Sequence, residues 1–318
     1  MHRRGTGHLR RVRGGRLTDS AAAYAVERTP DAAAFEARAL PFLGEREAEN
    51  NLVIGLARNL RNSPRSYGRD AWFMVVVRDG AVVGAALRTP PRYLILSGID
   101  DERAIDALAR DLAVHDAQLP GCMGELQVAQ RFVETWAWLT GARYAVTRRE
   151  RIHRLARVIW PRMPSGHARR AAASDRELLT AWIDAFWKES LGESDGGEAT
   201  LAVNRWLNEP ERTMYLWDDG RPVAMCGVSG PTPNGIRIGP VYTPPPLRRR
   251  GYASACVAVA SQEQIDAGRR FCFLFTDAAN ATANHIYREV GYEPVCDAIE
   301  YRIVPPSRGT LRATIGRA

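Results

Sequence analysis

Lysine is nearly absent from this sequence, since Lys188 is the only one among 318 residues. Arginine therefore supplies almost all of the positive charge. Phosphate recognition does not require lysine to be removed, so a biased genomic composition explains the scarcity better. Long apolar runs are missing as well. Runs such as 71–77 are far shorter than the roughly 18 residues that a membrane helix needs, so we expect no membrane-spanning segment.

Cysteine and histidine occur without the spacings of metal or redox sites. The five cysteines are scattered and form no C-x-x-C pair, which argues against a zinc site and a redox dithiol. Cys256 and Cys272 lie in apolar runs and are expected to be buried thiols. The six histidines show neither H-x-x-x-H nor H-E-x-x-H. We therefore expect no metal site.

The formal charge of +8 is concentrated at the two ends of the chain. Residues 1–18 hold six arginines and no acid, and residues 305–318 hold three arginines and no acid, which leaves about −1 for residues 19–304. We expect a basic disordered tail, a C-terminal tail, and no nucleic-acid binding through the folded body. Association with nucleic acid through the tails is a separate hypothesis. No apolar signal segment follows the first tail, so a cytoplasmic protein is expected.

The second half of the chain alternates helical and strand-like segments in a definite order. Apolar residues recur at helical spacing over 174–190, and Asp219-Gly220 is typical of a hairpin turn. The continuous apolar run 271–276 is typical of a buried strand. The expected order is β-α-α-β-β-β-α-β-α-β, with helices at 174–190, 198–208, 254–267 and 280–290 and strands at 213–217, 222–229, 236–243, 271–276 and 292–304.

The first half repeats this order more faintly. Its expected helices are 32–43, 47–61, 101–118 and 130–139, and its expected strands are 71–77, 81–87, 92–96, 126–128 and 142–158. Asp79-Gly80 matches Asp219-Gly220 at an offset of 140, and Gly141 matches Gly291 at an offset of 150. This favours an internal duplication with a linker at 161–166. The fold class is therefore α/β (α+β), with lobes at 31–162 and 165–304, each a mixed, mainly antiparallel sheet flanked by helices.

The densest chemical signal is the segment 241–254, VYTPPPLRRRGYAS. A strand ends at Thr243, and three prolines then remove backbone donors and stop sheet pairing. A basic turn leads directly into a helix, whose free N–H groups and dipole form an anion site. Gly251 permits a positive φ, and Ala253 leaves the approach open. The segment predicts a site for a pyrophosphate.

At these residues the sequence resembles a family. Arg248-x-x-Gly251-x-Ala253 matches the Q/R-x-x-G-x-G/A motif of the GNAT superfamily of N-acetyltransferases, and the resemblance covers roughly 165–304. Asp277, Asn280, Asn284, Tyr287 and Gly291-Tyr292 also look like that family. The resemblance implies acetyl-CoA as co-substrate and the amine of a small molecule as acceptor. Residues 31–162 resemble a degenerate copy, as in tandem-GNAT enzymes.

The resemblance also implies roles for individual residues. The backbone of Val241 and Thr243, with Tyr242 between them, would bind the pantetheine where the fourth strand parts from the fifth. The pyrophosphate would lie on the turn and first helical residues: Arg248, Arg249, Arg250, Gly251, Tyr252, Ala253 and Ser254. Asn280 would touch the cofactor arm, with Asn284 on the same helix face, and Asn280 could also cap its helix. Tyr287 would protonate the leaving thiolate, or else be a core aromatic.

The general base is less clearly marked. Residues 236–243 contain no acid, which leaves Glu189, Glu193 and Glu300 as candidates. We choose Glu189, since it follows the first helix and that region borders the acceptor site in the family. A non-catalytic coenzyme-A sensor or scaffold is the alternative that the missing base favours. A tandem acyltransferase similar to mycothiol synthase is a more specific variant of the enzyme.

The first half departs from the family pattern at both functional positions. Asp100, Asp101 and Glu102 stand where a pyrophosphate would lie, and like charge opposes its binding. Ala137, at an offset of 150 from Tyr287, has no proton to donate. We therefore expect this half to bind no acetyl-CoA and to have a structural role.

Overall fold

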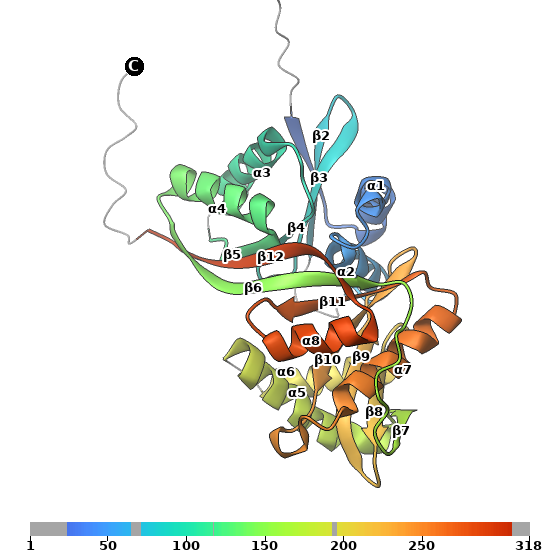
Figure 1. Ribbon diagram of the computed structural model, residues 1–318. Coiled ribbons are helices and arrows are strands. Elements are labelled where there is room, and N and C mark those ends of the chain that lie inside the picture. Colours follow the sequence, from blue (N-terminus) through green and yellow to red (C-terminus); the bar gives the residue numbers. More distant parts are fainter. Residues whose placement is uncertain (1–23, 65–70, 117, 193–195, 307–318) are drawn as a thin grey trace, which may run out of the picture.

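The computed structural model describes residues 24–64, 71–116, 118–192 and 196–306. The strands of these residues form one twelve-stranded sheet in the order β1-β2-β3-β4-β5-β12-β6-β11-β10-β9-β8-β7 (Figure 1). Only the β4–β5 and β10–β11 neighbours are parallel. The strands are β1 (Tyr24–Thr29), β2 (Trp72–Arg78), β3 (Ala81–Arg88), β4 (Leu94–Leu96), β5 (Gly121–Glu125), β6 (Arg143–Leu155), β7 (His167–Arg170), β8 (Thr213–Asp218), β9 (Pro222–Ser229), β10 (Gly235–Tyr242), β11 (Phe271–Asp277) and β12 (Glu293–Val304).

The order β-α-α-β-β-β-α-β-α-β occurs twice, from β1 to β6 and from β7 to β12. The matched glycines have the same function, because Gly141 and Gly291 end the fourth helix of each half with φ of 71° and 103°. The helices are α1 (Ala32–Glu45), α2 (Asn51–Asn62), α3 (Glu102–His115), α4 (Leu126–Thr140), α5 (Arg176–Leu191), α6 (Gly196–Asn208), α7 (Tyr252–Asp266) and α8 (Ala281–Val290).

The two halves exchange their last strands. β12 pairs antiparallel with β5 of the first half, with Tyr301 opposite Cys122. β6 pairs antiparallel with β11 of the second half, with Phe273 opposite Arg154. β6 and β12 also pair with each other. The expected division into 31–162 and 165–304 remains a prediction from the sequence, and the sheet crosses it.

Helices cover both faces of the sheet. Alternate residues of β2 point to opposite sides, so that Met74 and Val76 join the core under α3 and α4, whereas Phe73 and Val75 join the core under α1 and α2. β8 divides its residues in the same way between α7 on one face and α5 and α6 on the other. The mixed α/β fold with a mainly antiparallel sheet is thus the one that the sequence predicts.

The prediction of a strand at 126–128 is wrong. Leu126 begins α4, and the strand lies just before it as β5. Its sequence, GCMGE, has weak strand propensity because of the two glycines, yet both are needed. A Cβ on Gly121 would lie 2.3 Å from the Tyr301 carbonyl oxygen, and one on Gly124 would lie 3.0 Å from Leu96 Cβ. The predicted order begins with a strand in each half, for which the sequence indicates no residues; these strands are β1 and β7, which form the two edges of the sheet.

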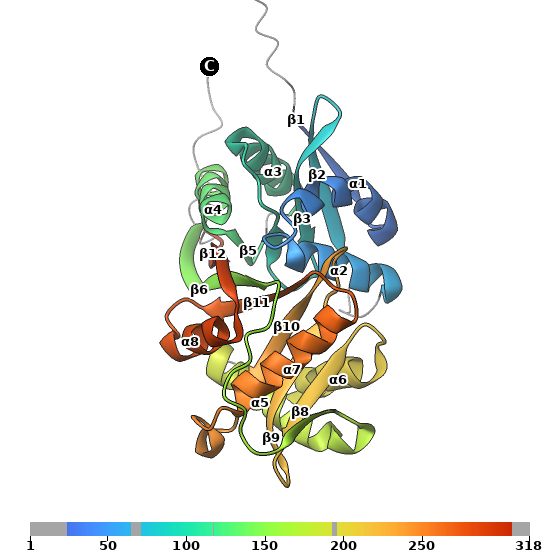
Figure 2. The ribbon, with the colours of Figure 1, turned by 45° about the vertical axis from the view of Figure 1, so that its right-hand side comes forward.

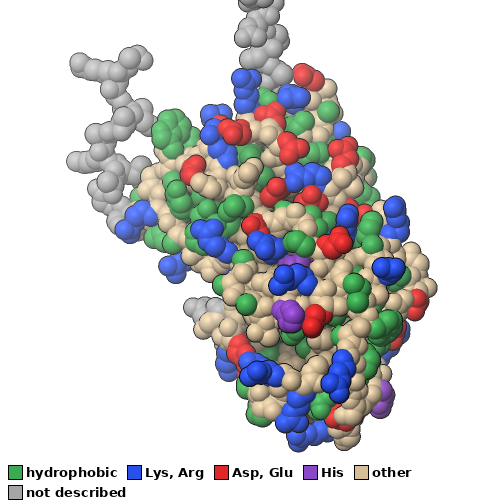
Figure 3. Space-filling view, in the orientation of Figure 1, with side chains coloured by type: hydrophobic (Ala, Val, Ile, Leu, Met, Phe, Trp, Pro, Cys, Tyr) green, Lys and Arg blue, Asp and Glu red, His purple; other side chains and the backbone are tan. Residues whose placement is uncertain are grey.

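Acidic and basic side chains are interspersed over the face of the molecule shown in Figure 3, in the orientation of Figure 1. This matches the near-neutral charge of the body between the two arginine-rich ends. The helices of the described residues include none that is long and apolar enough to cross a membrane.

Replacing Gly121 by Ala tests the pairing of β5 with β12, which joins the two halves. The new Cβ would press on the Tyr301 backbone at 2.3 Å, so β5 and β12 must move apart. We expect a loss of about 2–3 kcal/mol in the free energy of unfolding, measured by denaturant titration. Gly44→Ala is the control, because a Cβ there meets nothing within 4 Å. Equal stability of the two variants would contradict the close approach.

Candidate functional site

The site begins where β10 and β11 part. The two strands pair over only three positions, from Gly235–Phe271 to Arg237–Phe273. Beyond them β10 stays on β9, with an irregularity between Ile238 and Val241. The gap therefore opens beside Val241, Tyr242 and Thr243, as the sequence leads us to expect for a parted strand pair. Strand groups along such a gap are able to bind an extended ligand as an added strand would.

Thr243 closes β10 with an unused polar group. Its side chain is 9% exposed, and its Oγ1 has no hydrogen-bond partner among the described residues. An unpaired buried hydroxyl costs free energy. A ligand in the gap would remove that cost by bonding to it.

The bend after Thr243 has the backbone of an anion site. Prolines 244–246 carry no N–H, and a 3₁₀ turn follows at Pro245–Leu247. Arg249 and Gly251 both take left-handed conformations, with φ of 64° and 82°. Alternating left-handed residues turn successive N–H groups toward one side, which makes a concave anion-binding nest. The bend is thus shaped for a phosphate group.

The helix that follows leaves its N-terminus uncapped. α7 begins at Tyr252 with Gly251 as N-cap, and no side chain accepts a hydrogen bond there. The N–H groups of Tyr252, Ala253 and Ser254 are therefore not satisfied by a capping side chain. Together with the helix dipole they favour a negative charge. A Cβ on Gly251 would lie no closer than 3.7 Å to any neighbour, so the positive φ is the requirement for glycine there.

Arg248 points back to the sheet rather than outward. Its Nη2 donates to Glu189 Oε2 at 2.6 Å, and its Nε donates to the Thr243 carbonyl at 2.8 Å. The guanidinium also lies over the Tyr242 ring, 5.7 Å from its centroid. Arg248 therefore connects the bend to α5 although it is itself partly exposed, whereas the exposed Arg249 and Arg250 form no ion pair with a described residue.

Glu189, the chosen base, is held at the mouth of the gap. Besides Arg248 it accepts a hydrogen bond from the Tyr242 hydroxyl at 3.2 Å. Burial, and then the Glu189 charge, raise the pKa of Tyr242, so this phenol remains a donor. Glu189 is half-exposed and contacts two of the expected cofactor-binding residues.

Of the other two carboxylate candidates, Glu300 is not brought to the gap, and Glu193 lies outside the described residues. Glu300 lies on β12 opposite Met123 and Arg148, and it accepts a hydrogen bond from Thr147 at 2.7 Å. β6 and β11 separate that strand from β10. β10 itself carries no acid.

Tyr287 packs from α8 onto the core between α7 and the sheet. Its ring meets Tyr292 edge to face, with centroids 5.9 Å apart. Burial raises the pKa of its hydroxyl, and the neighbouring Cys226 thiol raises it further. Cys226 lies directly opposite Val241 in the β9–β10 register. The phenol is therefore near the β9 residue that pairs with Val241, and the hydrogen bonds of the described residues include none to it.

The two asparagines of α8 serve the protein itself. Asn280 caps α8 by accepting from Ala283 N at 3.0 Å, as the capping alternative predicts. Asn284 Oδ1 accepts from Thr276 at 2.7 Å, and its Nδ2 donates to the Asp277 carbonyl at 3.2 Å. Both residues fix the start of α8 to the end of β11. Asn280 is exposed and keeps its Nδ2 for a ligand.

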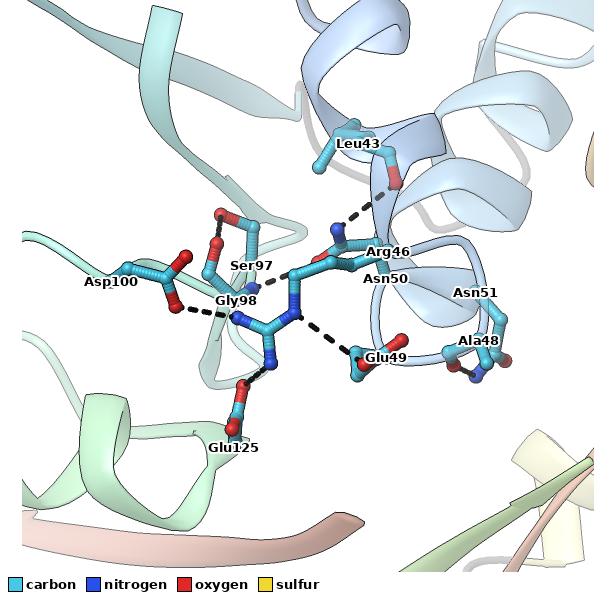
Figure 4. Close-up of polar contacts among 10 residues, drawn as sticks. All are labelled: Leu43, Arg46, Ala48, Glu49, Asn50, Asn51, Ser97, Gly98, Asp100 and Glu125. Carbon is cyan, nitrogen blue, oxygen red and sulfur yellow. Dashed lines mark hydrogen bonds and ion pairs between the residues drawn. The ribbon is translucent and has the colours of Figure 1, made fainter. Parts of the chain in front are cut away.

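The equivalent gap of the first half is filled. β4 and β5 pair at Leu94–Cys122 and Ile95–Met123, and beyond them Arg46 lies between the two strand ends (Figure 4). Its guanidinium donates to Asp100 at 2.9 Å and to Glu125 at 2.6 Å. A Cβ on Gly98 would lie 2.9 Å from Arg46 Nη1. Sequence reasoning missed Arg46, because its partners are distant in the chain.

The helix N-terminus in the first half carries its own anion. The Asp101 side chain caps α3 by accepting from Arg103 N at 3.0 Å. It also accepts from the Tyr24 hydroxyl at 2.6 Å and from Arg78 at 2.8 Å. The acid that the sequence shows at this position thus occupies the place that is left uncapped at α7.

Residues 177–292 match the model of the acetyltransferase (GNAT) family, so this segment of the second half is similar to that family. A comparison with curated proteins gives no match. No group of three His, Cys, Asp or Glu in the described part of the chain is placed to hold a metal ion.

Solved structures share the fold at low sequence identity. A Drosophila protein is similar with a TM-score of 0.62 and 14% identity, over 89% of this chain and 99% of that one. A GCN5-related N-acetyltransferase from Sphaerobacter thermophilus gives 0.55 and 18%, over 89% and 96%. Another from Kribbella flavida gives 0.50 and 17%, over 71% and 87%. The similarity extends across both halves, so the whole chain has the architecture of such proteins.

The dependence of stability on pH tests the role of the Asp101 carboxylate at the N-terminus of α3. The Tyr24 hydrogen bond, followed by the donors Arg103 and Arg78, lowers the pKa of Asp101. A lowered pKa stabilises the folded state above the unfolded value of about 3.9, and this stabilisation is lost as pH falls through the folded pKa. We expect Asp101→Asn to cost about 1 kcal/mol of unfolding free energy at neutral pH and less as the pH falls through the folded-state pKa of Asp101. Tyr24→Phe should reduce the same difference. Parallel stability–pH curves for wild type and Asp101→Asn would contradict this.

Proposed function

We propose that the chain is an acetyl-CoA-dependent N-acetyltransferase that acts on the amine of a small molecule. The observation that carries the proposal is the uncapped, left-handed bend 248–254 at the mouth of the β10–β11 gap, within the segment that matches the acetyltransferase family. The bend would take the pyrophosphate. Val241 and Thr243 would bind the pantetheine, and the unpaired Thr243 hydroxyl would gain a partner.

The proposed chemistry is direct attack of the amine on the thioester carbonyl carbon. An alkylammonium, with a pKa near ~10, first gives a proton to Glu189, directly or through a water. The C–N bond then forms, and a backbone N–H at Val241 would stabilise the oxyanion. As the C–S bond breaks, Tyr287 would donate its proton to the sulfur, and the second proton that the nitrogen loses on becoming an amide would return to the phenolate directly or through a water. Burial keeps the phenol protonated until then.

We propose that residues 31–162 are a degenerate copy that binds no acetyl-CoA. Arg46, held by Asp100 and Glu125, occupies the gap, and Asp101 occupies the helix N-terminus. Three acids and a bound guanidinium thus stand where the second half has an open gap and an uncapped helix N-terminus. The role of residues 31–162 is to pair β6 with the edge of β11 and to support the β9–β10 turn. Glu47 accepts a hydrogen bond there from Asn234 N at 2.8 Å.

Calorimetry with acetyl-CoA tests the cofactor site. We expect one equivalent to bind per chain. Gly251→Glu should weaken binding roughly 100-fold or more, because like charge at the bend costs several kcal/mol. Gly251→Asn is the matched control, since Asn tolerates a positive φ without adding charge, and it should bind nearly as wild type does. Binding of two equivalents of acetyl-CoA per chain would contradict the proposal that residues 31–162 bind none. Unchanged acetyl-CoA affinity in Gly251→Glu would refute the proposed pyrophosphate site at 248–254.

Turnover distinguishes the enzyme from a coenzyme-A sensor. Thiol release from acetyl-CoA is measured against a panel of primary amines. We expect Tyr287→Phe to lower kcat by about 10²–10⁴-fold, the usual contribution of a general acid, while acetyl-CoA affinity stays unchanged. A wild-type protein that binds acetyl-CoA but releases no thiol with any amine would favour the sensor. Full kcat in Tyr287→Phe would remove Tyr287 from the mechanism.

A further inference from the structure

The segment 156–166, here called the strap, joins β6 to β7 across the two helices of the proposed cofactor site. Figure 2 shows it passing between α8 and α7. At α8, Ile159 N donates to the Val290 carbonyl at 2.8 Å. At α7, the Arg162 carbonyl and the Pro164 ring lie 3.7 Å and 3.9 Å from the Cβ position of Gly251. The strap thus reaches the N-cap of the helix at the proposed pyrophosphate bend.

Hydrogen bonds hold the far end of the strap in place. The Ser165 carbonyl accepts from Trp217 Nε1 at 2.8 Å, and Ser165 Oγ donates to Asp219 at 3.0 Å. The same Asp219 carboxylate accepts from the hydroxyl of Tyr252, the first residue of α7, at 2.6 Å. The strap and the start of α7 are therefore tied to one carboxylate, which fixes their relative position.

The strap nevertheless presents large apolar side chains to solvent. Trp160 is 53% exposed and Met163 is 42% exposed, whereas Val158 beside them is buried. An exposed indole on a backbone held at both ends is a preformed stacking surface for a flat ring. It lies between the attachment of Ile159 at α8 and the contact of Arg162 with Gly251.

Positive charge is present on the strap itself and in the bend that the strap contacts. Arg162, Arg249 and Arg250 are exposed. None of them forms an ion pair with a described residue, and the hydrogen bond of Arg250 goes to the Pro246 carbonyl at 3.5 Å. Arg248, in contrast, is neutralised by Glu189. The three exposed guanidinium groups thus favour more negative charge than the bend alone would hold.

We propose that the strap binds the adenosine 3′-phosphate end of coenzyme A, with the purine stacked on Trp160 and the 3′-phosphate paired with Arg162. This rests on the proposed function, because the pyrophosphate at Gly251 is what brings the nucleotide to the strap. An indole stacks on a purine whatever its edge groups are, and a guanidinium pairs with a phosphate by charge-assisted hydrogen bonds. The linker between the halves is then part of the cofactor site.

The test compares the affinities of the full chain for coenzyme A and 3′-dephospho-coenzyme A by calorimetry. Wild type should prefer coenzyme A. Trp160→Ala should weaken both ligands by about 10-fold to 100-fold, the usual contribution of one stacked base, and Trp160→Phe should restore most of that loss. Arg162→Ala should weaken coenzyme A alone and abolish the preference. Trp138→Ala is the matched control, since Trp138 is 80% exposed on α4, and it should bind as wild type does.

The outcomes separate the two proposals. A wild-type protein that binds neither ligand refutes the proposed function and this inference with it. A wild-type protein that binds coenzyme A, while Trp160→Ala binds it equally well, overturns the stacking role and leaves the proposed function standing. A preference for the 3′-phosphate that survives in Arg162→Ala overturns the pairing.

Discussion

The exchange of β6 and β12 between the halves is the constraint on which the rest of the structure depends. Where two parallel strands part, each of them loses hydrogen-bond partners on the side of the gap. The strand farther along the sheet, β11 or β5, must then be held by hydrogen bonds on its other side. β6 supplies those partners to β11, and β12 supplies them to β5. The outer strand of each gap is therefore flanked by a strand that the other half contributes, so the position of β11 depends on the first half.

The two gaps share a backbone plan and differ in charge. In the first half Arg46 bridges Asp100 and Glu125, and Asp101 satisfies the helix N-terminus. In the second half prolines, a left-handed Arg249 and Gly251 leave the N-terminus of α7 uncapped. The same helix dipole thus acts on a built-in carboxylate in one half and remains for a ligand in the other. The two halves thus share an order of helices and strands and differ in the charged groups at the end of the parted strands.

Prediction from the sequence is best where a residue acts on its own backbone. The positive φ of Gly251, the helix ends at Gly141 and Gly291, and the turn at Asp79-Gly80 all follow from the residue types. Prediction fails where packing overrides propensity. β5 is a strand with two glycines because Tyr301 and Leu96 approach too closely for a side chain. The segment 126–128 looks like a strand but is the first turn of α4.

The sequence by itself determined the repeated order of helices and strands, the fold class and the left-handed bend before α7, because hydrophobic period, glycine conformation and the missing donors of proline are local properties. The tertiary structure decided which strands pair across the halves, that Arg248 turns to Glu189, 59 residues away, and that Arg46 meets Glu125, 79 residues away. It also decided that the linker lies against the N-cap of α7. These contacts depend on strand register between distant segments, and no local pattern in the chain encodes that register.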